Sequence, residues 1–259
     1  MTQSGEAVSR VAIGFAEVRG FRAIISPFLF RGMLVGMAIV AVAMHRLTRS
    51  HSLTWRFAKA RARTLTRMLG VHATLIGSEH LAGGGSFVFV PNHQSHLDIL
   101  LLLALLPGRT RFAAKQELWR HPVMAAILDT LGMVPIDRER PEVSVEFLNR
   151  AAASGDSFVI FPEGTRSRDG QLLPFKKGAF VLAIAAGLPV VPVTMRGTRR
   201  LMPRGSRMTV VPGDVEIVID EPIPTTGLGY DDRDALAAQV RAAIDIARVM
   251  HPNGFAPMS

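Results

Sequence analysis

The sequence has no cysteine, only one tyrosine and only two tryptophans among its 259 residues. The absence of cysteine excludes disulfides and thiolate metal ligands, and it leaves the redox compartment undetermined. Aromatic residues make up 7% of the chain, and the arginines are scattered among apolar stretches. Both features argue against a nucleic-acid-binding surface. We therefore expect no nucleic-acid partner.

The chain also lacks a long uninterrupted apolar run, because its longest one, residues 32–44, has 13 residues. A helix that spans a bilayer needs about 20. Hydrophobic residues nevertheless make up 48% of the chain, and the mean hydropathy is +0.26. This composition is more apolar than that of a typical soluble domain and too polar for a protein with many spans. It favours attachment to one membrane surface through a short segment.

The N-terminal region concentrates its apolar residues in positions 23–44, where Arg31 is the only charged residue. Arginines precede and follow this stretch, and Pro27 and Gly32 can bend it. We interpret residues 1–54 as a helical anchor that dips into one leaflet, with its arginines at the headgroups. A single spanning helix and a buried helical hairpin are the alternatives. A secretory signal is disfavoured because the long polar leader contains two glutamates.

The formal net charge of +9 predicts an anionic partner. Part of the excess lies in residues 56–69, whose basic amphipathic pattern suits a helix on an anionic membrane surface. A solvated helix face explains the same pattern equally well. The expected partners are therefore a phosphorylated substrate and an anionic membrane surface.

Beyond residue 54, short apolar runs alternate with helix-like stretches. Strand-like runs cover residues 87–90, 133–136, 158–161 and 190–193, and helix-like stretches cover residues 99–106, 143–153 and 178–186. This alternation predicts one α/β domain over residues 55–259, with a mostly parallel central sheet flanked by helices.

Near the C-terminus, two further apolar runs flank a Pro-Gly pair. Residues 208–211 and 215–219 therefore predict a β-hairpin around Pro212 and Gly213. Residues 231–250 have the periodicity of an amphipathic helix that closes the domain.

The densest polar cluster, residues 92–98, directly follows the predicted strand 87–90, and ligands of α/β sheets gather where strands end. If one helix contained both His93 and Asp98, their side chains would lie about 140° apart and would not meet. If the helix begins near Ser95, the imidazole can fold back onto the carboxylate and act as a general base. Ser95-x-x-Asp98 is also a capping box, so helix capping is the competing interpretation.

The same cluster contains a second histidine, His96, which is a rival base. A zinc site formed by His93, His96 and Asp98 lacks a convincing spacing and a further ligand cluster. We therefore expect no metal.

A second polar cluster, residues 161–168, follows another predicted strand. Its proline and glycine favour a tight turn, in which Thr165, Arg166 and Ser167 offer hydroxyl, guanidinium and backbone donors to a phosphate. A solvated charged loop is the competing interpretation.

Charged residues stand at other strand and helix ends as well. Asp137 and Arg138 follow the predicted strand 133–136, where a surface ion pair is the simpler explanation. Lys115 lies near another possible strand end. Lys176 adds positive charge at the start of the predicted helix 178–186, and helix starts favour anions.

Taken together, these segments resemble the glycerolipid acyltransferase family, especially the 1-acyl-glycerol-3-phosphate (lysophosphatidic acid) acyltransferases. Four blocks carry the resemblance in order: NHQSHLD at residues 92–98, GMVPIDR at 132–138, FPEGTRSRDG at 161–170 and GLPVVPV at 187–193, with FAAKQEL at 112–118 as a fifth matching stretch. One such block would be weak, whereas four in order form a specific signal.

The resemblance implies an enzyme that moves a fatty acyl group from a thioester to the sn-2 hydroxyl of lysophosphatidic acid, giving phosphatidic acid. It implies His93 as the general base and Asp98 as the residue that orients it, with no metal or bound cofactor. The acyl donor would be acyl-CoA or acyl carrier protein, and the catalytic domain would lie on the cytoplasmic face of the cell membrane. The residues implied to bind the acceptor are Lys115, Arg138, Glu163, Gly164, Thr165 and Arg166. Another lysolipid acceptor, such as a lyso-ornithine lipid, and a noncatalytic anionic-lipid-binding protein are the alternatives.

Overall fold

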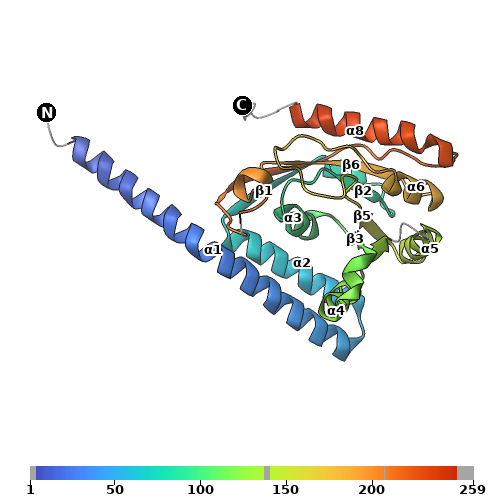
Figure 1. Cartoon of the computed structure of the whole chain (residues 1–259), viewed down its shortest axis with the longest axis horizontal. Coiled ribbons are helices and arrows are strands. Elements are labelled where there is room, and N and C mark those ends of the chain that lie inside the picture. The colour runs from blue at the N-terminus through green and yellow to red at the C-terminus, as the bar shows by residue number, and fades with distance from the viewer. Residues whose placement is uncertain (1–3, 137–140, 207, 250–259) are drawn as a thin grey trace.

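The computed structural model describes residues 4–136, 141–206 and 208–249 (Figure 1). A seven-stranded sheet forms its centre, with the strand order β1-β7-β6-β2-β5-β3-β4. Every pair of neighbouring strands is parallel except β6 and β7. The predicted mostly parallel sheet is therefore confirmed. The strands are β1 Val71–Ile76, β2 Val88–Pro91, β3 Arg109–Lys115, β4 Val134–Ile136, β5 Asp156–Val159, β6 Val190–Arg196 and β7 Gly213–Ile219.

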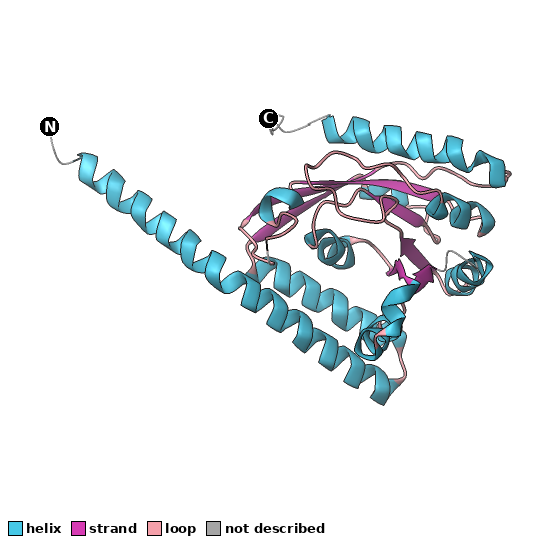
Figure 2. Ribbon diagram, in the orientation of Figure 1, coloured by secondary structure: helices cyan, strands magenta, loops and turns pink. Residues whose placement is uncertain are grey.

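Helices cover both faces of the sheet (Figure 2). One layer contains α1, α2, α3 and α4, and the other contains α5, α6 and α8. The helices are α1 Ser4–Thr48, α2 His51–Met68, α3 Leu97–Leu105, α4 Pro122–Thr130, α5 Pro141–Ala152, α6 Gly178–Ala185, α7 Thr198–Leu201 and α8 Arg233–Val249, with 3₁₀ turns η1 Ser78–Leu81, η2 Gln116–Arg120 and η3 Tyr230–Asp232.

Two hydrophobic cores fill the space between the sheet and these layers. Successive side chains of a strand point to opposite faces, so Phe89 of β2 joins the core beneath α2 and α3. Its neighbours Val88 and Val90 join the core beneath α5, α6 and α8. Because β2 is central and buried on both faces, the loop that follows it is held in a fixed place.

The N-terminal helix α1 is the longest element and extends beyond the body of the domain (Figure 1). Pro27 and Gly32 could bend this segment, yet the helix continues through both. Its stretch Pro27–Thr48, with 22 residues, is long and apolar enough to cross a membrane, and 11% of the most apolar window is buried. The 13-residue run therefore underestimates the apolar length, because the neighbouring residues extend it.

The predicted elements near the C-terminus differ in how well they match the structure. The predicted hairpin is wrong: residues 208–212 form no strand, and β7 lies between β1 and β6, so both of its edges are already paired. Met208 has a positive φ of 70°, which interrupts an extended backbone.

The predicted closing helix is confirmed as α8. The division of the chain after residue 54 falls inside α2 and stays a prediction.

Candidate active site

The loop between β2 and α3 brings an imidazole and a carboxylate into contact. The helix begins at Leu97, so His93 lies in the preceding loop and Asp98 in the first helical turn. The His93 Nδ1 atom is 2.9 Å from Asp98 Oδ2. The Asp98 side chain is fully buried, whereas that of His93 retains a small exposed area. The bend near Ser95 that would allow this contact is present.

The same carboxylate oxygen also organises the loop backbone. Asp98 Oδ2 accepts hydrogen bonds from the backbone amides of Gln94, at 2.7 Å, and Ser95, at 2.8 Å. The amide of Leu97 donates to Ser95 Oγ at 3.2 Å. The two interpretations of Asp98 are therefore compatible, because its carboxylate both caps the start of α3 and contacts His93.

Hydrogen bonds from distant segments hold the backbone of this loop. The Asn92 side chain is buried and exchanges two hydrogen bonds with the backbone of Met195 in β6. The His93 amide donates to Glu163 Oε1 at 2.7 Å, and the Ser167 amide donates to the His93 carbonyl at 2.8 Å. The loop that contains His93 is thus fastened to the sheet on one side and to the loop after β5 on the other.

Glu163 links three segments from a buried position. Its second oxygen, Oε2, accepts from the backbone amide of Leu173 at 3.0 Å. Burial raises the pKa of the Glu163 carboxyl, although the amides of His93 and Leu173 act in the opposite direction. With one backbone hydrogen bond on each oxygen, Glu163 positions the two loops, and its contact with the acceptor stays a prediction.

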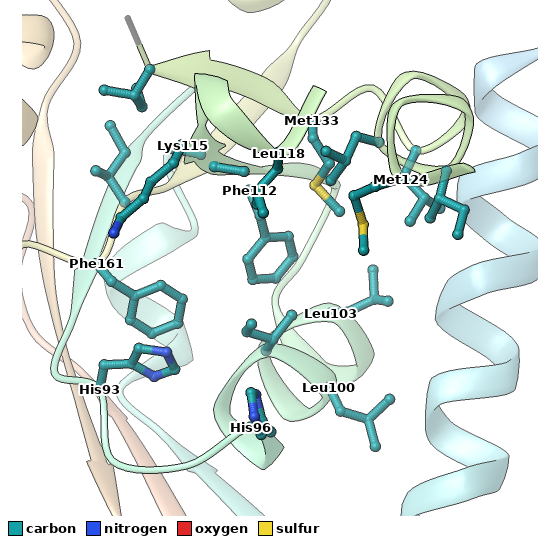
Figure 3. A pocket seen from close by; sticks show the side chains of 18 of the residues that line it. His93, His96, Leu100, Leu103, Phe112, Lys115, Leu118, Met124, Met133 and Phe161 are labelled. Atoms are coloured by element: carbon teal, nitrogen blue, oxygen red, sulfur yellow. The ribbon is translucent and has the colours of Figure 1, made fainter. Parts of the chain in front are cut away.

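An apolar cavity opens beside the histidine (Figure 3). Its volume is about 990 Å³, and its walls come from α1, α3, β3, α4 and α6. The ring of Phe161 stacks on the His93 imidazole, with centroids 4.0 Å apart. Leu100, Leu103 and Met124 line the interior away from the histidine. A volume of this size is at the upper end of the range for small-molecule sites.

Cationic side chains surround the polar end of the cavity. Lys115, at the end of β3, and Lys176, just before α6, both line it. The Lys176 side chain crosses Gly164, whose φ of +64° favours glycine, and a Cβ there would lie 2.9 Å from Nζ. No carboxylate in the described ranges forms an ion pair with Lys115, Lys176 or Arg166.

Arg166 lies close enough to His96 for its charge to change the pKa of the imidazole. Burial lowers the pKa of His96, and the neighbouring Arg166 lowers it further. Burial and the charge of Arg204 lower the pKa of Arg166, although Asp98 opposes this change. A cation in such surroundings gains from a bound anion. His96 also lines the cavity, but within the described residues it is the His93 ring that forms a hydrogen bond with Asp98.

The predicted site residues thus separate by position. His93, His96, Lys115 and Gly164 line the cavity, and Asp98 contacts His93. The Arg166 side chain is half-buried, Thr165 is exposed, and neither lines the cavity. Glu163 is held by backbone amides instead of facing it. Arg138 lies outside the described residues.

Sequence reasoning assigned no role to several residues that the structure places here. Phe161 and Asn92 lie inside the recognised sequence blocks. Only the fold reveals that Phe161 stacks on His93 and that Asn92 forms hydrogen bonds with β6. Lys176 was noted for its charge alone. The described residues contain no group of three or more His, Asp or Glu that could hold a metal ion.

Comparisons with known proteins agree with this geometry. The model of the Acyltransferase family matches residues 72–196. The chain is 31% identical over 216 residues to human 1-acyl-sn-glycerol-3-phosphate acyltransferase alpha, covering 82% of this chain and 76% of that protein. It is 45% identical over 140 residues to the chloroplastic 1-acyl-sn-glycerol-3-phosphate acyltransferase BAT2 of Brassica napus, covering 52% of this chain. The chain spans about two fifths of the length of that plant relative, 40%.

A solved structure is also similar. The crystal structure of the 1-acyl-sn-glycerophosphate (LPA) acyltransferase PlsC from Thermotoga maritima superposes with a TM-score of 0.71 at 27% identity, covering 88% of this chain and 95% of that one. The chain therefore belongs to the acyltransferase family. Its relatives within that family are 1-acyl-sn-glycerol-3-phosphate acyltransferases, so the resemblance found in the sequence blocks is confirmed.

Proposed function

We propose that the chain transfers an acyl group from a thioester to the sn-2 hydroxyl of lysophosphatidic acid, giving phosphatidic acid. The observation that carries this proposal is the 2.9 Å contact between His93 Nδ1 and Asp98 Oδ2 at the polar end of an apolar cavity. The names of the relatives support the choice of acceptor.

The hydrogen-bond pattern supports one arrangement of the protons in this pair. Asp98 Oδ2 already accepts from the backbone amides of Gln94 and Ser95, so it acts as an acceptor toward His93 as well. Nδ1 then carries the hydrogen, and Nε2 keeps its lone pair for the acceptor hydroxyl. The carboxylate also stabilises the imidazolium that forms when Nε2 takes a proton.

The reaction then proceeds in a balanced sequence. Nε2 of His93 removes the hydroxyl proton as the oxygen attacks the thioester carbonyl. When the C–S bond breaks, the imidazolium returns that proton to the departing thiolate. An ester and a free thiol result, and His93 is neutral again. The chain's own groups suffice for this sequence, and the acyl donor, acyl-CoA or acyl carrier protein, enters as a co-substrate.

The cations at the polar end suit the acceptor's phosphate. A phosphomonoester carries a charge of about −1.5 to −2 at pH 7. Lys115 and Lys176 at the polar end of the cavity, with Arg166 near His96, can supply compensating charge and hydrogen bonds. Gly164 leaves room for the Lys176 side chain to lie across the loop. Arg138, which lies outside the described residues, stays a predicted member of this set.

The position of α1 relative to the domain supports attachment to one leaflet. The helix α2 packs along the C-terminal half of α1, and Phe30 of α1 is buried in the same core as Ala58 and Leu65 of α2 (Figure 1). If residues 27–48 crossed the bilayer, the exposed arginines of α2 would be carried to the same depth. Each arginine at the bilayer centre costs about 2.5–3.5 kcal/mol on insertion scales. We therefore propose that residues 1–54 lie in the cytoplasmic leaflet of the cell membrane as an anchor.

The outer face of α1 offers a test of this anchor. Ile39 and Val40 are exposed and do not line the cavity. We expect the double substitution Ile39→Asp, Val40→Asp to reduce flotation with anionic liposomes, while Ile246→Asp on α8 leaves flotation unchanged. Equal flotation of all three proteins would contradict the placement.

The function is tested by measuring thioester consumption by the full chain in mixed micelles. The acceptors are lysophosphatidic acid, lysophosphatidylglycerol and a lyso-ornithine lipid, each offered with acyl-CoA and with acyl carrier protein. We expect consumption with lysophosphatidic acid and its loss in His93→Ala, whereas His72→Ala, an exposed histidine on β1, keeps activity. Preference for another acceptor would replace the proposed substrate, and full activity of His93→Ala would contradict the mechanism.

A further inference from the structure

The segment formed by η2 and the start of α4 exposes apolar side chains to solvent. Leu118 of η2 is 43% exposed, and Val123 and Met124 at the start of α4 are 63% and 39% exposed. Together with Trp119 they form a surface that we call the Leu118–Met124 edge. Within the described residues no other segment packs over it. Adjacent apolar side chains that remain exposed indicate contact with another apolar phase.

This edge is continuous with the helix proposed as the membrane anchor. The helix α4 lies beside the C-terminal half of α1 (Figure 1). Met124 and Leu118 line the same cavity as Leu34 and Ala38 of α1. Apolar residues of α1 and of the edge therefore line one cavity together.

The remaining residues of the edge have the chemistry of a lipid headgroup boundary. The indole nitrogen of Trp119 donates to Asp129 Oδ1 at 2.7 Å, so its polar atom is satisfied and its ring remains available for apolar contact. Tryptophan of this kind is enriched where lipid meets water. Arg120 and His121 are exposed beside it and can face anionic headgroups. Glu117, the exposed carboxylate of this segment, must then face water.

We propose that the Leu118–Met124 edge inserts into the boundary between headgroups and acyl chains, as a second membrane contact beside α1. A lipid acceptor can then pass from this boundary into the cavity, which both α1 and the edge line. An inserted apolar face reaches about 5–10 Å into this boundary. The inference rests on the proposed membrane placement of α1, but it concerns a different segment.

The two tryptophans of the chain allow a direct measurement. In Trp55→Phe, Trp119 is the only fluorophore of its kind. We expect its emission to be quenched in vesicles of phosphatidylglycerol and phosphatidylcholine that carry bromine near the top of the acyl chains. The control is Trp55→Phe, Trp119→Phe, Tyr230→Trp, which places a tryptophan at an exposed position of η3. We expect little quenching there, because η3 lies near α6 and α8 on the other layer.

Val123 provides a variant that separates membrane contact from folding. An aspartate in the first turn of α4 is favoured by the helix dipole, so Val123→Asp keeps the helix stable in water. In the lipid boundary the same carboxylate is unfavourable. We expect Val123→Asp to reduce the quenching of Trp119 by about half or more, because the apolar insertion of the edge is lost. Ile246→Asp, a similar change on α8, leaves the quenching unchanged.

The outcomes distinguish this inference from the anchor. A chain that floats with vesicles while Trp119 is quenched no more than the Tyr230→Trp control overturns the edge and leaves the anchor intact. The same result follows if a second copy of the chain covers the edge, because bromine then cannot approach the indole. A chain that does not float overturns both placements. Quenching that Val123→Asp does not reduce also overturns the insertion.

Discussion

The two ends of the cavity are built by different forces. At the polar end, the backbone of His93 is bound by Glu163 and Ser167, and its ring is bound by Asp98. At the apolar end, α1 contributes a wall that includes the apolar side chains of Ala38 and Val42. Hydrogen bonds are directional, whereas apolar packing tolerates small displacements at low cost. The proposed reaction therefore takes place at a rigid end of the cavity, and the proposed site for the lipid chain is an adaptable one.

The largest effect expected from this difference comes from Asp98→Asn. The amide oxygen can still accept from the backbone of Gln94 and Ser95, so the loop keeps its shape. That same oxygen position contacts His93 Nδ1, so the amide NH₂ replaces the buried Asp98 Oδ1. The neutral amide then lacks the negative charge that stabilises the His93 imidazolium. We expect kcat to fall by about 10²- to 10⁴-fold with the thermal midpoint nearly unchanged. Steady-state kinetics and thermal unfolding check this result, and an unchanged kcat would show that Asp98 serves only as a cap.

A smaller but broader effect is expected for Glu163→Ala. The backbone amides of His93 and Leu173 lose their acceptor, and a buried donor without a partner costs about 1–3 kcal/mol. We expect the free energy of unfolding to fall by about 2–4 kcal/mol and kcat to fall with it. The control is Glu117→Ala, an exposed glutamate. Chemical denaturation of both variants makes the comparison, and equal stability would show that the loops are held by other contacts.

The polar end was predictable from sequence where the signal is local. The strand before residue 92 and the helix after it follow from apolar runs, and a helix that begins near Ser95 is enough to bring His93 to Asp98. The role of Glu163 was not predictable, because its partner His93 lies 70 residues away in the chain. A carboxylate that binds a backbone amide leaves no pattern in the sequence.

The apolar end shows the opposite limitation. The sequence predicts that residues 23–44 form an apolar helix. It does not predict which side of this helix packs against the domain. The structure shows that this helix forms a wall of the cavity. The incorrect hairpin at 208–219 has a similar cause, because only the sheet order reveals that β7 already has two neighbours.

Arg166→Ala tests whether charge at the polar end acts on binding more than on chemistry. Arg166 has no carboxylate partner in the described ranges and lies near His96. We expect the KM for lysophosphatidic acid to rise about tenfold, which corresponds to about 1.4 kcal/mol, with a smaller change in kcat. Arg168→Ala, at an exposed position of the same loop, is the matched control. A fall in kcat alone would assign Arg166 to the reaction instead of to acceptor binding.

Hydrogen bonds also join α2 to the C-terminal end of α3, and the protonation of Lys59 makes them depend on pH. Lys59 of α2 donates to the Leu106 carbonyl, and Arg63 donates to the Ala104 carbonyl at 2.8 Å. Burial, with a smaller contribution from Arg63, lowers the pKa of Lys59 from 10.5 to about 8. Between these values the unfolded chain binds more protons than the folded one, so this group makes the protein more stable as pH rises.

We therefore expect the free energy of unfolding of the wild type to rise relative to that of Lys59→Met between pH 8 and pH 10.5. Because Lys59 is only half-buried, the shift is on the order of 1 kcal/mol. Denaturant titrations at several pH values measure it, with Lys177→Met, an exposed lysine, as the control. A difference that stays constant across this range would contradict the lowered pKa.

The smallest effect is expected at the adaptable wall. Ala38→Phe adds a ring to the cavity side of α1, whereas Val40→Phe adds the same ring to an exposed position that does not line the cavity. A rigid wall would exclude long acyl chains strongly. Because α1 is held there by packing, we expect it to yield, so that the ratio of kcat/KM for long and short acyl donors changes by only about threefold in Ala38→Phe. A change of more than tenfold, with Val40→Phe unaffected, would show that the apolar end is as rigid as the polar one.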